Sequence, residues 1–157
     1  MTTAPAEPHG GGTELGILRR ALAVIVVVGA AGLTAELLLL EHYETAWQYS
    51  PLALLVLTMA TGTIALLRPT HAVIRVFQAV MTLCIASGIV GVWLHYQGNV
   101  EWELERDAAV RGWMLFKEAL TGATPALAPG AMIQLGLVGL AFAWRHPAAR
   151  SARLVRE

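Results

Sequence analysis

The chain has 157 residues, of which 56% are hydrophobic and only 14% are charged, and its formal net charge is zero. A soluble domain carries about 25% charged residues, so this composition excludes an ordinary soluble domain and indicates a membrane protein. The neutral balance gives no attraction for nucleic acid, and the single cysteine, Cys84, excludes an internal disulfide and a two-cysteine redox relay.

Four apolar runs follow one another along the chain, at residues 21–40, 51–67, 76–94 and 123–144. Each run has roughly the 17–25 residues that a helix needs to cross about 30 Å of hydrocarbon. We therefore expect an all-α integral membrane protein with a four-helix transmembrane bundle at residues 16–146. Residues 1–15, rich in Pro and Gly, are predicted to be a disordered tail. Residues 147–157 are predicted to form a short basic tail near anionic lipid.

Charge divides the two sides of the four runs. One side holds eight basic residues, which are Arg19, Arg20, Arg68, Arg75, Arg145, Arg150, Arg153 and Arg156. The positive-inside rule then places both termini in the cytoplasm and the acidic loops outside. Ten of the eleven basic residues are Arg, which is typical of a GC-rich bacterial genome. We expect a multi-pass protein of the bacterial inner membrane, with the lipid bilayer around it.

The first and third runs end alike, and the second and fourth runs begin alike. His42-Tyr follows the first run, and His95-Tyr follows the third. Ser50 and Thr124 each precede a proline, which is a favourable start for a helix. One interpretation of this pattern is a 2+2 repeat of two helical hairpins with like orientation.

The second outer loop contains a helical periodicity. Over residues 107–120, at about 100° per residue, Asp107, Arg111 and Glu118 fall on one face. The opposite face is apolar and consists of Ala109, Trp113, Phe116 and Leu120. We predict a short amphipathic helix, which either lies flat on the outer membrane surface or caps the outer end of the bundle.

Glu36 and Gln134 are the candidate intramembrane polar site. Glu36 lies roughly 6 Å below the outer end of the first run, at a rise of 1.5 Å per residue. A carboxylate at that depth is expected to face the bundle and to find a partner or a proton. Candidate partners are Gln134 and the carbonyl of Pro125, since Pro129 has no N–H to donate to it. The site is either a proton or cation site or a structural carboxyl.

His42 and His95 form a second candidate site, because both lie at the outer ends of predicted spans and share a depth. Two histidines from different helices can ligate a haem iron axially, or bind Cu or Zn with a carboxylate. The alternative is that both are interfacial anchors. Near them lies a predicted outer acidic rim, which consists of Glu41, Glu44, Glu101, Glu103 and Glu105. Residues 101–105 are predicted to be a solvated loop, with a short strand as the alternative.

No nucleophile has an evident base in reach, so we predict no catalytic residues. The favoured function is a non-catalytic accessory or structural subunit of a membrane complex, with a protein partner or a second copy. One alternative is a haem- or metal-binding redox protein that uses His42 and His95. Another is a small proton-coupled transporter that works as a homodimer around Glu36.

Overall fold

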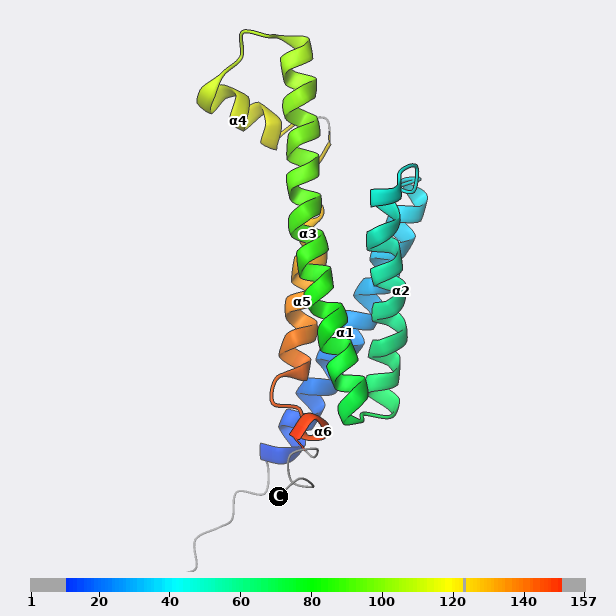
Figure 1. Cartoon of the computed structure of the whole chain (residues 1–157). Coiled ribbons are helices and arrows are strands. Elements are labelled where there is room, and N and C mark those ends of the chain that lie inside the picture. The colour runs from blue at the N-terminus through cyan, green and yellow to red at the C-terminus, as the bar shows by residue number, and fades with distance from the viewer. Residues whose placement is uncertain (1–10, 123, 151–157) are drawn as a thin grey trace, which may run out of the picture.

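The protein is helical along the parts of the chain that its computed structural model describes, residues 11–122 and 124–150. In these parts the helices are α1 (Gly11–Leu39), α2 (Ala46–Leu67), α3 (His71–Arg106), α4 (Gly112–Leu120), α5 (Gly130–Ala143) and α6 (Pro147–Arg150), as Figure 1 shows. The predicted all-α architecture is confirmed.

Within the described ranges, three helices are long and apolar enough to cross a membrane, namely α1 from Glu14, α2 and α3. They contain the first three predicted runs. Because α1 begins at Gly11, residues 11–15 of the predicted tail are helical. The remainder of that tail and residues 151–157 lie outside the described residues.

The fourth predicted span is wrong in its first third. Residues 126–129 form turns, and the helix begins only at Gly130. Pro125 and Pro129 explain the difference, because a proline inside a helix has no N–H and clashes with the carbonyl four residues back. Hydrogen bonds between residues three apart form instead: the Ala128 N–H donates to the Pro125 carbonyl over 3.1 Å. The resulting α5 has 14 residues and rises about 21 Å.

The third span continues much further than predicted. α3 has 36 residues, rises about 54 Å, and includes residues 101–105, which were predicted as a loop or a strand. That segment contains no Gly or Pro, and Arg106 in the last turn complements the helix dipole. Figure 1 shows the end of α3 projecting well beyond the turn between α1 and α2. The predicted amphipathic helix exists as α4, which starts at Gly112 rather than at residue 107.

Two antiparallel hairpins build the molecule, α1 with α2 and α3 with α5 (Figure 1). The start of α1, the α2–α3 turn and α6 lie at one end, where Arg19 Nη2 donates to the Arg145 carbonyl over 3.5 Å. We call this the basic end. The opposite end, with the α1–α2 turn, α4 and the end of α3, we call the acidic end.

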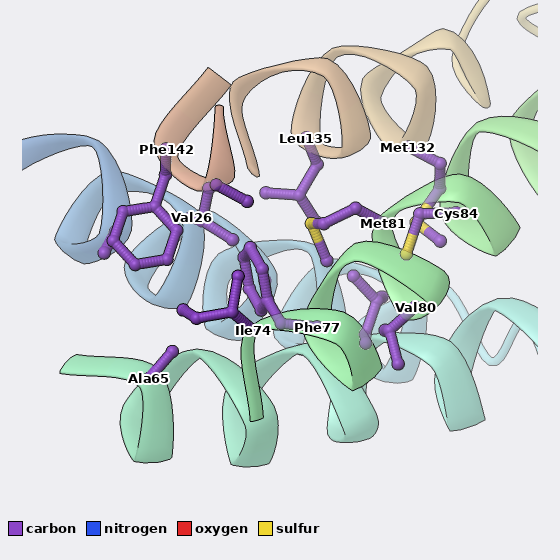
Figure 2. Close-up of a cluster of buried hydrophobic side chains, with 14 residues drawn as sticks. Val26, Ala65, Ile74, Phe77, Val80, Met81, Cys84, Met132, Leu135 and Phe142 are labelled. Atoms are coloured by element: carbon purple, nitrogen blue, oxygen red, sulfur yellow. The ribbon is translucent and has the colours of Figure 1, made fainter. Parts of the chain in front are cut away.

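A single hydrophobic core joins α1, α2, α3 and α5. Phe77 of α3 and Phe142 of α5 meet edge to face with ring centroids 5.4 Å apart, and Figure 2 shows them among aliphatic side chains from the other helices. Figure 1 shows the two hairpins diverging toward the acidic end. Toward the acidic end the cluster continues between α1 and α2 through Leu33, Leu37 and Leu54, whereas its last member on α3 is Cys84.

Glycines let α3 and α5 approach closely. A Cβ added at Gly88 would lie 2.9 Å from the Pro129 carbonyl oxygen, and one added at Gly136 would lie 2.6 Å from the Met81 carbonyl oxygen. Gly130, at the start of α5, has no neighbour within 4 Å of an added Cβ, so the close approach begins further along the helix.

Candidate functional site

The turn after α1 directs His42 back toward α3. The His42 N–H donates to the Leu37 carbonyl over 2.9 Å, and the Glu41 N–H donates to the Leu38 carbonyl over 3.2 Å. This is a Schellman ending, which needs its last residue in the left-handed region. Glu41 takes that place with φ of 51°, although glycine is the favoured residue there. A strained residue thus positions the histidine.

His95 is half-buried on α3 and contacts the turn before α5. Its Nδ1 lies 3.2 Å from the Pro125 carbonyl oxygen. A carbonyl can only accept, so this bond assigns the ring proton to Nδ1 and leaves the Nε2 lone pair available. The Pro125 carbonyl was predicted to lack a backbone donor because Pro129 has no N–H. In the structure it accepts hydrogen bonds from His95 and from the Ala128 N–H, and not from Glu36.

The structure brings the rings of the two histidines close together. The ring centroids of His42 and His95 are 6.0 Å apart, and the planes are tilted by 59°. Burial lowers the pKa of His42, the nearby His95 lowers it further, and Glu44 opposes both. The ring of His42 is therefore neutral at neutral pH, with a nitrogen lone pair free to accept or to coordinate. Within the described ranges, no group of three His, Cys, Asp or Glu side chains is arranged to hold a metal ion.

Asn99 organises the polypeptide between α4 and α5, and sequence reasoning missed it. Its side chain is 1% exposed. Nδ2 donates to the carbonyls of Ala119 over 2.8 Å and Thr124 over 2.6 Å, while Oδ1 accepts from the Thr124 N–H over 3.1 Å. The residue lies after the predicted third span, in a segment expected to be a loop, where an asparagine is common and gives no signal of its own. Asn99 fixes α4 and the start of the α5 segment on α3.

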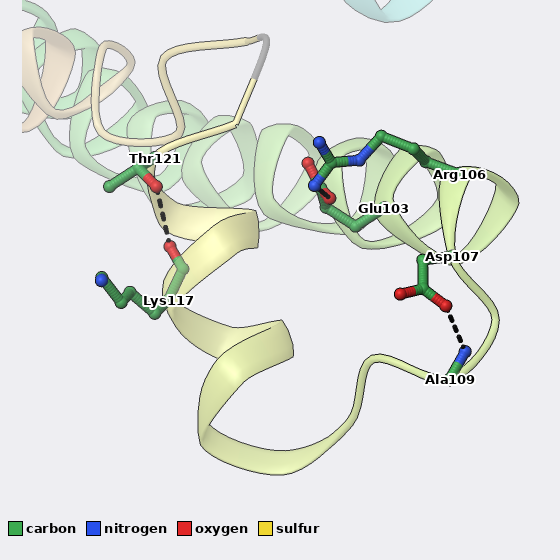
Figure 3. A network of polar contacts seen from close by, with 6 residues as sticks. All are labelled: Glu103, Arg106, Asp107, Ala109, Lys117 and Thr121. Carbon is green, nitrogen blue, oxygen red and sulfur yellow. Dashed lines mark hydrogen bonds and ion pairs between the residues drawn. The ribbon is translucent and has the colours of Figure 1, made fainter.

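Polar contacts at the tip of α3 secure the chain reversal into α4 (Figure 3). Glu103 is buried, 5% exposed, and pairs with the exposed Arg106 one turn later. Asp107 Oδ1 accepts from the Ala109 N–H over 2.9 Å. Glu103 is thus a buried carboxylate paired within its own helix, and it does not belong to the exposed rim as predicted.

The other predicted rim residues lie at two separate levels. Glu41 and Glu44 belong to the α1–α2 turn, whereas Glu101 and Glu105 are exposed on the projecting part of α3. Because α3 extends beyond that turn (Figure 1), the four do not form one ring. The acidic end instead carries one acidic group beside His42 and another near α4.

Aromatic side chains run from α3 onto α4. Ring centroids are 6.3 Å apart for Trp93 and Tyr96, 6.0 Å for Tyr96 and Phe116, and 5.2 Å for the stacked Trp113 and Phe116. Trp113 is 76% exposed and Met114 is 57% exposed. Met114 lies on a different face of α4 from the predicted apolar stripe. Within that stripe Trp113 is exposed, whereas Phe116 contacts Tyr96 and Leu120 is half-buried, so α3 covers the stripe only in part.

Glu36 does not face the helix interior, so the predicted orientation is wrong. It is exposed, as is Gln134 on α5, and no hydrogen bond joins them in the described part of the chain. The inward stripe of α1 runs through Ala30, Leu33 and Leu37. Glu36 lies about 100° around the helix from Leu37 and points elsewhere. A transport role for Glu36 would require a second copy to cover it.

The comparisons with known proteins add no family to this geometry. No protein-family model, no curated protein sequence and no solved structure matches the chain. Function is therefore inferred from the residues of this chain alone.

Proposed function

We propose that this chain is a non-catalytic accessory subunit of a bacterial inner-membrane complex. Its helices α1, α2, α3 and α5 span the bilayer as a four-helix bundle, with both termini in the cytoplasm. The segment 97–122, which we call the α4 extension, docks a partner protein outside the membrane. The observation that carries the proposal is the exposed apolar surface of α4, held away from the membrane-spanning part of α3.

The glycine packing of α5 supports it as the fourth span, although it is shorter than a full crossing. Non-helical backbone at membrane depth is tolerated where protein covers it. Ala126 in the preceding turns is buried, and Pro129 packs against Gly88 and Gly91 of α3. Trp144 directly follows the helix at the basic end, where an aromatic ring settles at the membrane boundary. The turns and α5 together are long enough to cross.

The charges at the two ends support the orientation. Arg19, Arg20, Arg68, Arg75 and Arg145 lie at the basic end. The positive-inside rule assigns such an end to the cytoplasm, because short loops rich in Arg stay on that side. The α4 extension then lies on the extracytoplasmic side, where a soluble domain of another subunit can reach it.

The shape and chemistry of the α4 extension favour a protein over lipid as its partner. α3 continues about 18 Å past the end of the third apolar run, at 1.5 Å per residue, and α4 packs alongside that part (Figure 1). Trp and Met are enriched at the centres of protein interfaces, and exposed Trp113 and Met114 are adjacent on α4. The Asn99 hydrogen bonds hold this surface in one position, so docking does not require ordering it first.

Purification in mild detergent from native membranes tests the proposal. Wild-type protein is expected to co-purify with another polypeptide in stoichiometric amount. A photocrosslinking residue in place of Trp113 should form a protein adduct, whereas one in place of the exposed Leu57 on α2 should react with lipid.

Trp144→Ser is the matched control for Trp113→Ser, because Trp144 is 72% exposed at the opposite end. We expect loss of the co-purifying polypeptide with Trp113→Ser only. A lone species from wild-type membranes, or equal losses with both variants, contradicts the proposal. A crosslink from position 113 to lipid alone also contradicts it.

A further inference from the structure

The acidic halves of the two hairpins meet through His42 in the α1–α2 turn and His95 on α3. We propose that these two side chains together bind one divalent transition-metal ion, Zn²⁺ or Cu²⁺, on the outer side of the membrane. The ion would connect the hairpins where the hydrophobic core no longer holds them together. This site is separate from the docking surface on α4 and does not depend on a partner.

The separation of the rings fits a shared ion. Metal–nitrogen bonds of about 2.0–2.1 Å place each imidazole centroid about 3.2 Å from the metal. Two centroids around one ion are then about 5.2 Å apart at a tetrahedral angle and at most about 6.4 Å apart. The observed 6.0 Å lies within this interval.

The hydrogen bond of His95 is the kind that supports a metal ligand. Ligating histidines usually donate the other ring N–H to a carboxylate or a backbone carbonyl, which fixes the tautomer and orients the ring. The Nδ1 of His95 is 3.2 Å from the Pro125 carbonyl oxygen, so Nε2 is the free coordinating atom. Pro125 and Pro129, which delay the start of α5, place the Pro125 carbonyl where His95 can donate to it.

The surroundings of His42 favour a bound cation. Its side chain is partly buried, and its ring lies beside that of His95. Glu44 lies close enough to influence that ring. Its carboxylate gives a favourable potential for a cation.

The remaining coordination positions belong to water. Among the residues described by the structure, no third His, Cys, Asp or Glu completes the group with these two histidines. Sites with open positions exchange their metal more readily than closed structural sites. Imidazole ligands suit Zn²⁺ and Cu²⁺, and Cu²⁺ is expected to bind more tightly.

Metal titration of the purified full-length protein tests the proposal. After treatment with chelator, one equivalent of Zn²⁺ is expected to bind by calorimetry and to raise the melting temperature. The Cu²⁺-loaded protein should show an electron paramagnetic resonance spectrum with two imidazole nitrogens. His42→Ala and His95→Ala should each weaken binding by at least about tenfold, since loss of even a second-shell partner costs roughly 10–100-fold.

His71→Ala is the matched control, because His71 is exposed at the opposite end of α3, and it should bind metal like the wild type. If an alanine variant fails to fold, the nitrogen count in the wild-type Cu²⁺ spectrum still decides. Binding weaker than a Kd of about 1 mM, fewer than two coordinated nitrogens, or unchanged affinity in both folded variants overturns the proposal. A haem absorption band in the purified protein overturns it as well, because the histidines would then hold a different group.

Discussion

Replacing Asn99 by alanine should release α4 from α3 without unfolding the membrane helices. Three hydrogen bonds disappear, and each contributes about 1 kcal/mol net. Alanine is a better helix former than asparagine and restores roughly 0.7 kcal/mol to α3. The carbonyl of Ala119, a buried residue, is left without its side-chain donor, which adds about 1 kcal/mol when water cannot replace it. We expect α4 to lose about 2–3 kcal/mol of stability against local opening.

Hydrogen exchange measured by mass spectrometry reports that opening directly. At 1.4 kcal/mol per factor of ten, the amides of α4 should exchange roughly 30 to 140 times faster in Asn99→Ala. The amides of α2 should be unaffected. Gln97→Ala is the control, because Gln97 is exposed on the same helix two residues earlier. Equal exchange rates in wild type and Asn99→Ala, or the same acceleration with Gln97→Ala, would refute the role given to Asn99.

Other changes probe the packing, the turn and the titration of the acidic end. Gly136→Ala places a Cβ 2.6 Å from the Met81 carbonyl oxygen and should destabilise the protein by about 1–3 kcal/mol in a thermal melt. Gly130→Ala is the control, because a Cβ there meets open space and should leave the melting temperature unchanged. Equal melting temperatures for the two variants would count against the close α3–α5 contact. Glu41→Gly removes the strain of a side chain in the left-handed region and should stabilise the protein by about 1 kcal/mol. An unchanged or lowered melting temperature would contradict this. The pKa of His42 is lower in the folded state than its ordinary value of about 6.5. The unfolded chain therefore takes up the proton first, and stability should fall as pH decreases through 6.5. Thermal melts from pH 8 to 5 should show a smaller decrease for His42→Asn than for the wild type, and identical pH profiles would contradict this.

The membrane helices and the histidine pair follow from simple sequence features. Length and apolar composition predict α1, α2 and α3, because a bilayer imposes a minimum span on any crossing helix. His95 follows directly after the third apolar run, and His42 follows one residue after the first. Their common depth made them a candidate pair. The sequence does not contain the sideways distance between the rings, which depends on how the hairpins pack.

The α5 segment and Asn99 show where hydropathy is insufficient. Residues 125–129 are apolar, so their composition resembles that of a span, but Pro125 and Pro129 prevent a continuous helix there. The partners of Asn99 are backbone groups of Ala119 and Thr124. Every residue has such groups, so no residue type in the sequence marks these two as the partners.

The outward orientation of Glu36 could have been predicted from the sequence. Depth in the membrane predicted a partner, yet depth does not say which side of the helix a residue occupies. The small and branched residues Ala23, Val26 and Ala30, spaced by three and four, mark the buried face of α1. Glu36 does not continue that series. A helical projection anchored on small residues would have placed it on the outside.

The most direct test of the account is the side of the membrane on which α4 lies. Single cysteines in place of Trp113 and Arg145, in a Cys84→Ala background, can be labelled in intact cells with a membrane-impermeant maleimide. The account predicts labelling at position 113 in intact cells and at position 145 only after permeabilisation. Labelling at position 145 in intact cells, with position 113 protected until the membrane is opened, would contradict it.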